Sequence, residues 1–460
     1  MDISFSKMSR RKFLAFSAAG IGAGVLAACA PAAAPAGGGA AGPAGAKATI
    51  TYWDWWGPAG NAVLKNLFDR LPVALKEHKP DLDLNYQNVP FGDEYFQKFL
   101  AAHAADDTPD VMHSSVYWAR DFFDKGALLD LKPFIEKTPD LATDKFISGA
   151  LSQAVKGPAQ YGVPGEGPDS SQIFYNLDLF KAAGVTTDPD AIAKWTWQDF
   201  TDAAKALTKM DGDQVKQSGF MVPKPDAAML SVWASCHGVS FYAKNGDGVE
   251  TGVGFNDKNA AINGLKWTLD LLNKDKVSKP ITPQRQDWQE FMQGTAAMAV
   301  DGPWSYGQLR TDMPNLNWFT MIFPAANVDG GKAGTAVWNN MLVIPTKSKN
   351  KEAGWSFMEF WCGLDWMKER LAIGFWMAPR KDFYETAEYK AQFAKLPVLA
   401  MVPKASAAGT PLVFIQQNAL DTTIQPIMDA IILGQEPVES GVDKLVTQCN
   451  EVLAKAGYKA

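Results

Sequence analysis

The sequence predicts an α/β protein built on mainly parallel sheets. Between residues 48 and 131, short β-rich runs alternate with segments whose apolar residues recur at helical spacing. The predicted strands are 48–53, 82–89 and 110–113, and the predicted helices between them are 62–76 and 95–105. Strand-helix-strand order is typical of parallel sheets, because parallel neighbours need a crossover connection. A chain of 460 residues also favours two domains over one.

The rest of the chain continues the mixed pattern. We expect strands at residues 171–175, 295–300, 318–323 and 337–344, and helices at residues 179–184, 197–210, 227–236, 258–273, 288–292 and 352–363, with a mostly helical C-terminal segment. No repeat of solenoid period is present in the sequence.

Residues 291–307, FMQGTAAMAVDGPWSYG, combine a helix end, a buried strand and a second helix start. Gly294 suits the positive φ of a helix C-terminus, and Pro303 suits the first turn of a new helix. Trp304 then stands at a helix N-terminus just beyond the carboxyl end of a strand, where open α/β sheets place ligands. Both a core position and a ligand contact fit Trp304 on this stretch alone.

The N-terminus carries an export signal. Residues 9–14, SRRKFL, contain twin arginines, an apolar run extends to residue 28, and LAAC at residues 26–29 resembles a bacterial lipobox. We therefore expect the twin-arginine route, with lipidation of Cys29. Residues 30–46 contain only Ala, Pro and Gly, which is typical of a tether.

Charge and cysteine content exclude several classes. Residues 1–28 carry four basic side chains and one acidic side chain, so their removal takes the formal net charge from −6 to −9. An acidic domain argues against nucleic acid as the partner. Cys236, Cys362 and Cys449 allow one disulfide at most, and no spacing suggests a metal or another cofactor.

Several ordered blocks resemble the family of bacterial extracellular solute-binding proteins of ABC importers that includes maltose-binding protein. These blocks are TYWDWW at 51–56, TPDV at 108–111, GALLDL at 126–131, YGVP at 161–164, FYNLDLFKAAG at 174–184, WTWQDF at 195–200, the stretch 291–307, and SKNKEA at 348–353.

The resemblance implies two α/β lobes joined by three chain crossings, with the solute between the lobes. The first lobe would comprise residues 48–160 and 324–371, and the second residues 166–318 and 380–460. The crossings would fall near residues 161–165, 319–323 and 372–379. Such a protein closes on its ligand by hinge motion.

The predicted solute contacts are aromatic and polar residues at the carboxyl ends of strands, because sugars offer apolar CH faces and rings of hydroxyl groups. They are Trp55, Trp56, Ser114, Ser115, Tyr117, Trp118, Glu166, Asp169, Trp233, Trp304, Trp338, Asn339, Trp376 and Arg380.

The resemblance implies a monomeric, lipid-anchored receptor on the outer face of the bacterial cytoplasmic membrane that delivers a sugar to a membrane permease. Two alternatives stay open. A glycoside-processing enzyme would use paired carboxylates, but the sequence lacks the zinc-protease, P-loop and nucleophile-elbow motifs. The same fold could instead bind a phosphodiester, a polyamine or a peptide, although the aromatic content, with 16 Trp and 26 Phe, favours a neutral sugar.

Overall fold

The first sheet begins with three parallel strands near the start of the folded chain. β1 (Ala48–Asp54) lies between β2 (Leu82–Asn88) and β3 (Val111–Ser115) and is parallel to both. The computed structural model describes residues 47–240, 243–244, 250–252, 257–375, 378–412 and 415–458, so Cys29 and the predicted signal and tether lie outside the described residues. The three strands confirm the parallel order that the sequence predicts.

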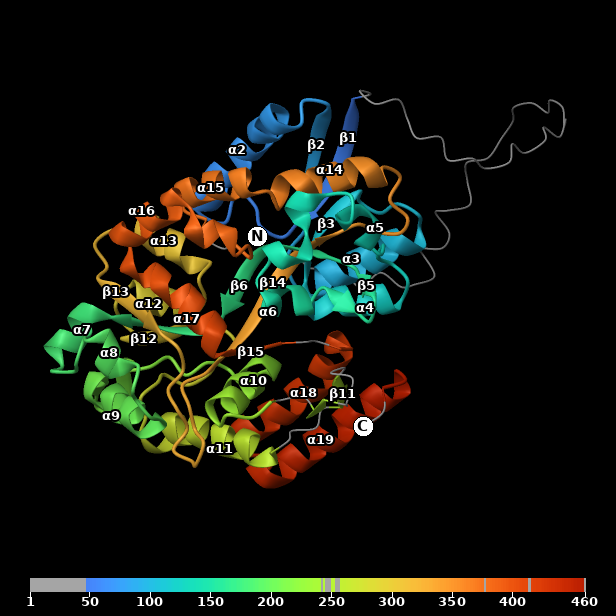
Figure 1. The fold of residues 1–460 in the computed structure, drawn as a ribbon. Helices are drawn as coiled ribbons and strands as arrows, with labels where there is room; N and C mark the ends of the chain where they lie inside the picture. Colours follow the sequence, from blue (N-terminus) through green and yellow to red (C-terminus); the bar gives the residue numbers. More distant parts are fainter. Residues whose placement is uncertain are drawn as a thin grey trace, which may run out of the picture. The chain divides into compact units, whose positions relative to one another are not determined.

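One long strand extends this sheet. β14 (Thr335–Val343) is antiparallel to β3 and to β6 (Val163–Ser170), and it is parallel to β15 (Gly409–Pro411). Figure 1 shows β14 leading from β3 toward β15 and α10 (Ala227–Cys236). Residues more than 100 positions apart in the sequence thereby meet in one sheet.

The second sheet is antiparallel. β7 (Gln172–Asn176) lies between β12 (Met298–Asp301) and β13 (Trp318–Met321), and it is antiparallel to both. Parallel bridges join residues 218 and 221 to residues 296 and 299. The sheets are therefore mixed, where the sequence predicted mainly parallel ones, because β7 is paired by two strands that come much later in the chain.

Helices cover the sheets, with short hairpins between some of them. The helices are α2 (Ala62–His78), α3 (Asp93–Ala104), α4 (Val116–Asp124), α5 (Lys132–Ile135), α6 (Ser148–Ser152), α7 (Leu177–Ala182), α8 (Pro189–Ile192), α9 (Trp197–Leu207), α10, α11 (Lys258–Leu269), α12 (Asp287–Met292), α13 (Ser305–Asp312), α14 (Lys351–Trp361), α15 (Leu364–Ile373), α16 (Ala387–Lys395), α17 (Met401–Ala408), α18 (Gln417–Ile432) and α19 (Val438–Lys455). The two-stranded hairpins pair β4 (Val155–Lys156) with β5 (Ala159–Gln160), β8 (Lys209–Asp211) with β9 (Gln214–Gln217), and β10 (Ala243–Lys244) with β11 (Glu250–Gly252).

Local sequence explains where these helices begin and end. α9 starts with a capping box in which Thr196 and Asp199 exchange side-chain and backbone hydrogen bonds. α12 ends before Gly294, whose φ of +72° matches the predicted left-handed position. The predicted bounds of α10 agree with the structure because its apolar run is bounded by Asp226 at the start and Gly238 after the end.

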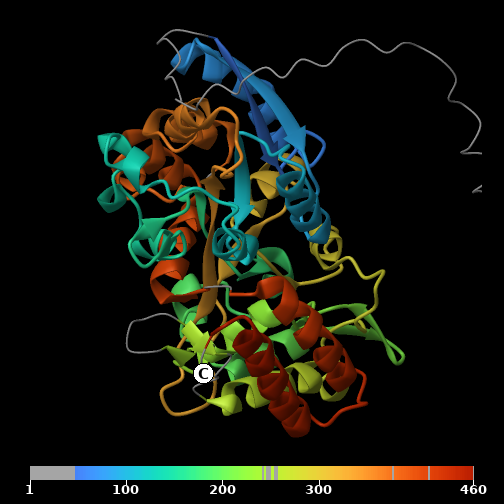
Figure 2. The same ribbon diagram turned by 90° about the vertical axis from the view of Figure 1, so that its right-hand side faces the viewer.

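The core forms where the apolar helix faces meet the sheets. α2 buries Leu64, Leu67, Leu71 and Leu75 at helical spacing. Figures 1 and 2 show the C-terminal helices α18 and α19 beside α10 and α11. Cys236, Cys362 and Cys449 are buried and unpaired. In the described part of the chain, no helix is both long enough and apolar enough to cross a membrane.

Candidate functional site

Three adjoining cavities form one groove. The central compartment, of about 350 Å³, is walled by Trp55, Trp56, Phe91, Ser115, Tyr117, Asp169, Trp304, Trp338 and Asn340. It shares three of its tryptophans with a cavity of about 560 Å³ beside α13, which we name the α13 compartment. It shares Phe91 and Tyr117 with a cavity of about 760 Å³ beside α18, which we name the α18 compartment. The three compartments therefore adjoin one another along shared side chains.

Strand ends position the walls of the central compartment. Trp55 and Trp56 follow β1 directly, and Ser115 ends β3, which is parallel to β1. Parallel strands end at the same edge of a sheet, so these side chains meet there. Trp304 approaches from the second sheet, since it follows β12 and caps α13.

The ring of Trp304 folds back over a glycine. A Cβ atom on Gly302 would lie 2.1 Å from the Trp304 ring, closer than real Cβ contacts allow. The ring lies 5.8 Å from that of Trp338 between centroids. Gly302 therefore sets the position of Trp304 without contacting a solute itself.

A buried histidine supports the floor of the groove. The imidazole of His113 stacks under Trp55, with 4.0 Å between ring centroids and 11° between planes. Its Nδ1 lies 3.0 Å from Asp54 Oδ1 and its Nε2 lies 3.1 Å from Glu166 Oε1. Burial lowers the pKa of His113, but the Glu166 and Asp54 carboxylates more than offset this and raise it to about 10. His113 is therefore a cation at neutral pH.

Glu166 connects this histidine to the groove walls. Its carboxylate accepts hydrogen bonds from Trp56 Nε1, at 3.0 Å, and from Asn340 Nδ2, at 2.9 Å. Burial raises the pKa of Glu166, but the charge of His113 and these hydrogen bonds hold it below its ordinary value. Glu166 is wholly buried behind the central compartment, so it orients the wall residues and does not itself line the cavity.

Asp169 differs from Glu166 because it lines the cavity. Asn340 Nδ2 donates to Asp169 Oδ2 at 2.9 Å, while Asp169 Oδ1 has no hydrogen-bond partner among the described residues. Burial and the charge of Glu166 raise the pKa of Asp169 well above its ordinary value. The site thus offers a solute one carboxyl oxygen that the protein leaves unsatisfied.

Most of the predicted contacts lie in the groove. Seven of them line the central compartment: Trp55, Trp56, Ser115, Tyr117, Asp169, Trp304 and Trp338. Trp118 lines the α18 compartment. Trp376 lies outside the described residues.

Two predicted contacts do not line the cavity, whereas the next residue on the same strand does. Asn339 is fully buried and donates to Gln153, whereas its neighbour Asn340 lines the cavity. Ser114 is likewise fully buried, whereas Ser115 lines the cavity. Side chains alternate along a strand, so only one residue of each adjacent pair faces the groove.

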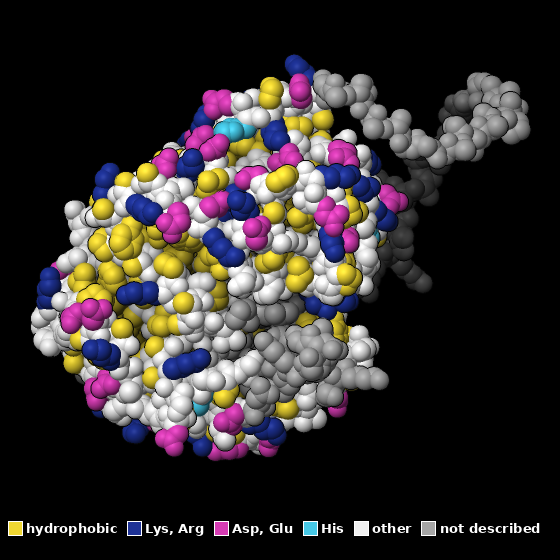
Figure 3. All heavy atoms as spheres, viewed as in Figure 1, with side chains coloured by type: hydrophobic (Ala, Val, Ile, Leu, Met, Phe, Trp, Pro, Cys, Tyr) yellow, Lys and Arg dark blue, Asp and Glu magenta, His cyan; other side chains and the backbone are white. Residues whose placement is uncertain are grey.

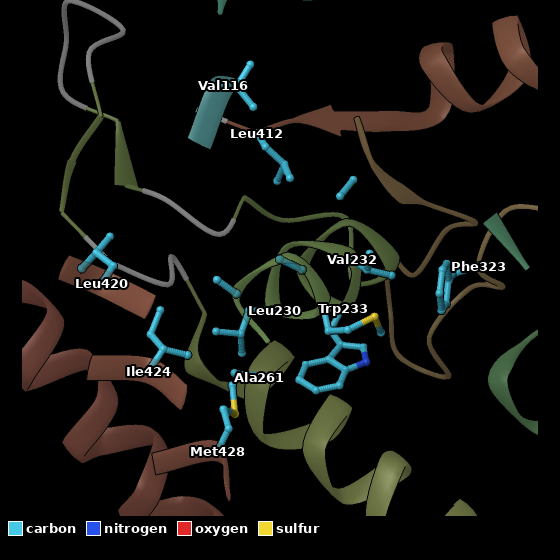
Figure 4. Packing of buried hydrophobic residues seen from close by; sticks show 14 of the residues in the cluster. Val116, Leu230, Val232, Trp233, Ala261, Phe323, Leu412, Leu420, Ile424 and Met428 are labelled. Carbon is cyan, nitrogen blue, oxygen red and sulfur yellow. The ribbon is translucent and has the colours of Figure 1, made fainter. Parts of the chain in front are cut away.

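Two other predicted contacts are buried and do not line the groove. Trp233 is 1% exposed and lies in the core, where its indole packs on Gly264 of α11. Figure 4 shows Trp233 among buried side chains that include Leu230 and Ala261. Arg380 is 1% exposed and forms ion pairs with Asp140 and Asp382, so its guanidinium has structural partners.

The prediction omitted several groove residues. Phe91 lies just beyond the end of β2, the strand beside β1, so the strand-end rule that selected Trp55 also applied to it. Trp288 and Phe375 line the α13 compartment, and Asp226 and Asp421 line the α18 compartment. The last four lie at helices or loops that only tertiary packing brings to the groove.

Two further hollows lie apart from the groove. One, of about 700 Å³, is lined by residues of 213–215 and 272–290. The other, of about 480 Å³, lies between residues 310–319 and 395–398, and Figure 3 shows hydrophobic side chains gathered over α13 and β13 on this face. Neither contains a predicted contact. No cluster of His, Cys, Asp and Glu suited to a metal ion is found among the described residues.

Comparison with known proteins defines the class. Residues 33–365 match the family described as bacterial extracellular solute-binding protein, and the chain belongs to this family. An arabinooligosaccharide-binding protein of Bacillus subtilis is 27% identical over 321 residues, which is 68% of each chain.

Solved structures with the same two-lobed α/β fold are similar over most of the chain. An ABC substrate-binding protein of Listeria monocytogenes in complex with cycloalternan has a TM-score of 0.75 and 22% identity, over 88% of this chain and 99% of that one. The GacH receptor of Streptomyces glaucescens, solved unliganded and with acarbose, has a TM-score of 0.72 and 23% identity, over 88% of this chain and 98% of that one.

Proposed function

We propose that this chain is the receptor of an ABC importer and that the groove holds a saccharide for delivery to a membrane permease. The observation that carries the proposal is the central compartment. Four half-buried indoles, those of Trp55, Trp56, Trp304 and Trp338, wall a cavity that is also lined by Asp169, whose Oδ1 has no partner among the described residues. Flat aromatic faces suit the CH faces of sugars, and a carboxyl suits their hydroxyl groups.

The size of the groove favours an oligosaccharide. The central compartment of about 350 Å³ shares lining residues with two larger compartments. A chain of several sugar rings fits such a groove better than a single ring, which the central compartment alone would hold. The relatives described as binding arabinooligosaccharide, cycloalternan and acarbose support this choice.

The proposed mechanism is capture without chemical conversion. The first lobe, residues 48–160 and 324–371, would supply the walls beside β1 and β3. The second lobe, residues 166–318 and 380–460, would supply Trp304 and close on the solute about the three crossings. A solute that contacts both lobes stabilises the closed form, because it binds that form better than the open one.

The proposed anchor is lipidated Cys29, after export through the twin-arginine route. Metabolic labelling with a fatty acid would mark the natural chain, and the Cys29→Ser variant should lose the label and leave the membrane fraction. Labelling of the variant at the natural level would refute the anchor while leaving the groove assignment intact.

Binding is tested by screening saccharides of one to about seven rings against tryptophan fluorescence and thermal unfolding. We expect at least one to change the indole emission and to raise the melting temperature. Chromatography of the same mixtures should recover the saccharide unchanged. Turnover would favour a glycoside-processing enzyme, and the absence of any saccharide response would refute the proposal.

A further inference from the structure

The groove is acidic throughout. Asp169 lines the central compartment, Asp301 lines the α13 compartment, and no Lys, Arg or His is among the described residues that line any of the three compartments. The α18 compartment adds four more carboxyl groups: Asp93, Asp226, Asp421 and Asp429. Carboxylates that line a cleft without basic neighbours give it a negative potential, which concentrates cationic ligands.

Only one of the carboxyl groups that line the α18 compartment forms an ion pair among the described residues. Within the described ion pairs of the α18 compartment, Lys224 contacts Asp429 at 3.0 Å, and Asp226 and Asp421 have no such contact. Burial, followed by the charges of Asp226 and Asp93, raises the pKa of Asp421 to about 7, although a hydrogen bond from Gln417 lowers it. A bound cation would favour the charged form of these carboxyl groups.

The central compartment contains a second feature that favours a bound ligand. Asp169 lines the central compartment and is 1% exposed, and its buried Oδ1 has no hydrogen-bond partner among the described residues. A buried polar atom without a partner is costly, so a ligand group that hydrogen-bonds to it gains affinity. The surrounding indole faces attract cations as well as CH groups.

Tyr117 joins the two acidic parts. Its ring lines both the central and the α18 compartments, and burial together with the charges of Asp226, Asp421 and Asp169 raises the pKa of its hydroxyl. A ligand that extends from the central compartment into the α18 compartment therefore contacts Tyr117 on the way. An extended ligand can contact carboxyl groups in both compartments.

We propose that the solute is an oligosaccharide of amino sugars. Its protonated amines would pair with Asp169 in the central compartment and with Asp226 and Asp421 in the α18 compartment. This inference rests on the proposed saccharide function and narrows its substrate class. Sugar rings stack on the indoles, while each ammonium supplies the cation that the groove lacks. Charge-assisted hydrogen bonds of this kind are roughly twice as strong as neutral ones.

The test uses three trimers that share the same β-1,4 linkage and differ at the second carbon of each ring: those of glucosamine, N-acetylglucosamine and glucose. Titration calorimetry of the full chain at about pH 7 measures the three affinities, because an amine with a pKa near 8 is mostly charged there and Asp421 is about half ionised. We expect the glucosamine trimer to bind at least about tenfold more tightly than either neutral trimer, and added salt to weaken it selectively.

Isosteric variants locate the charge effect. Asp226→Asn and Asp421→Asn should each weaken the glucosamine trimer about tenfold and change the glucose trimer less than about twofold. Asn can retain the helix cap of Asp226 and the hydrogen bond from Gln417 to position 421, so both variants should fold. Asp190→Asn, an exposed side chain outside the groove, should leave all affinities unchanged.

The outcomes separate this inference from the proposed function. A neutral saccharide that binds as tightly as every amine-bearing probe overturns the inference and leaves the receptor function in place. Equal binding of the glucosamine trimer by Asp226→Asn, Asp421→Asn and the natural chain overturns the carboxylate assignment. A protein that binds no saccharide, or binds only a polyamine, overturns the proposed function and the inference together.

Discussion

Replacing Gly302 by alanine should weaken solute binding without unfolding the protein. The new Cβ would lie 2.1 Å, 2.2 Å and 2.5 Å from three atoms of the Trp304 ring, so the ring must rotate. Gly302 does not have a positive φ, and the backbone therefore accepts alanine. Because Trp304 is half-buried and faces two groove compartments, it can move at a cost of about 1 kcal/mol in the free energy of unfolding.

The loss in affinity follows from the contact that Trp304 provides. Burying an aromatic side chain against a ligand contributes roughly 1.5–3 kcal/mol, so removal of this face should weaken binding roughly ten- to a hundredfold. Calorimetric titration with the saccharide identified by screening measures the affinity, and thermal unfolding measures the stability.

Gly294→Ala is the matched control from the same stretch of chain. Gly294 has a φ of +72° and no atom within 4 Å of a built Cβ, so alanine there strains the backbone without touching the groove. We expect a loss of about 1 kcal/mol in the free energy of unfolding and an unchanged affinity. Natural affinity in Gly302→Ala would show that Trp304 does not contact the solute.

Four further variants test the walls, the floor and the neighbouring core. Trp338→Ala should weaken saccharide binding at least about tenfold at nearly natural stability. Trp233→Phe should instead lower the melting temperature and leave the affinity unchanged. The reverse pattern would contradict our placement of both indoles. Trp56→Phe keeps an aromatic face but loses the hydrogen bond to Glu166, so denaturant titration should show a loss of about 1.5–3 kcal/mol in the free energy of unfolding, and no loss would contradict that bond. Folding raises the pKa of His113 to about 10 from about 6.5 in the unfolded chain, so protonated His113 stabilises the fold fully below about pH 6.5 and this stabilisation is lost as the pH rises through 10. In thermal melts, the natural chain should lose more stability from pH 7 to 10 than the His113→Gln variant. Parallel losses in the two proteins would contradict the assignment.

Local patterns in the sequence predicted the elements whose boundaries local residues determine. β1 and α10 have apolar runs bounded by turn and capping residues, and their predicted bounds agree with the structure to within one residue. The strand-end rule likewise brought Trp55 and Ser115 to the groove, because parallel strands end at one edge whatever their tertiary surroundings.

Strand β6 could not be predicted from local sequence, because it depends on pairing with a strand far along the chain. β6, VPGEGPDS, contains glycine and proline residues typical of a loop, and it becomes a strand only because β14, more than 160 residues later, pairs with it. The choice between Asn339 and Asn340 did not need this pairing, because alternation along β14 places Asn340 on the same face as Trp338.

The positions of Trp233 and Trp304 show why a tryptophan in the sequence does not by itself identify a binding site. Each indole lies against a glycine whose Cβ would collide with it, Gly264 for Trp233 and Gly302 for Trp304. Gly264 belongs to a neighbouring helix, so its contact joins α10 to α11 and buries the ring. Gly302 lies two residues before Trp304 in the same turn, so its contact holds the ring at the edge of the second sheet, where the half-buried ring also lies beside Trp338 and lines the groove. A tryptophan packed against its own turn still has a free face to offer a ligand, whereas one packed between helices has none.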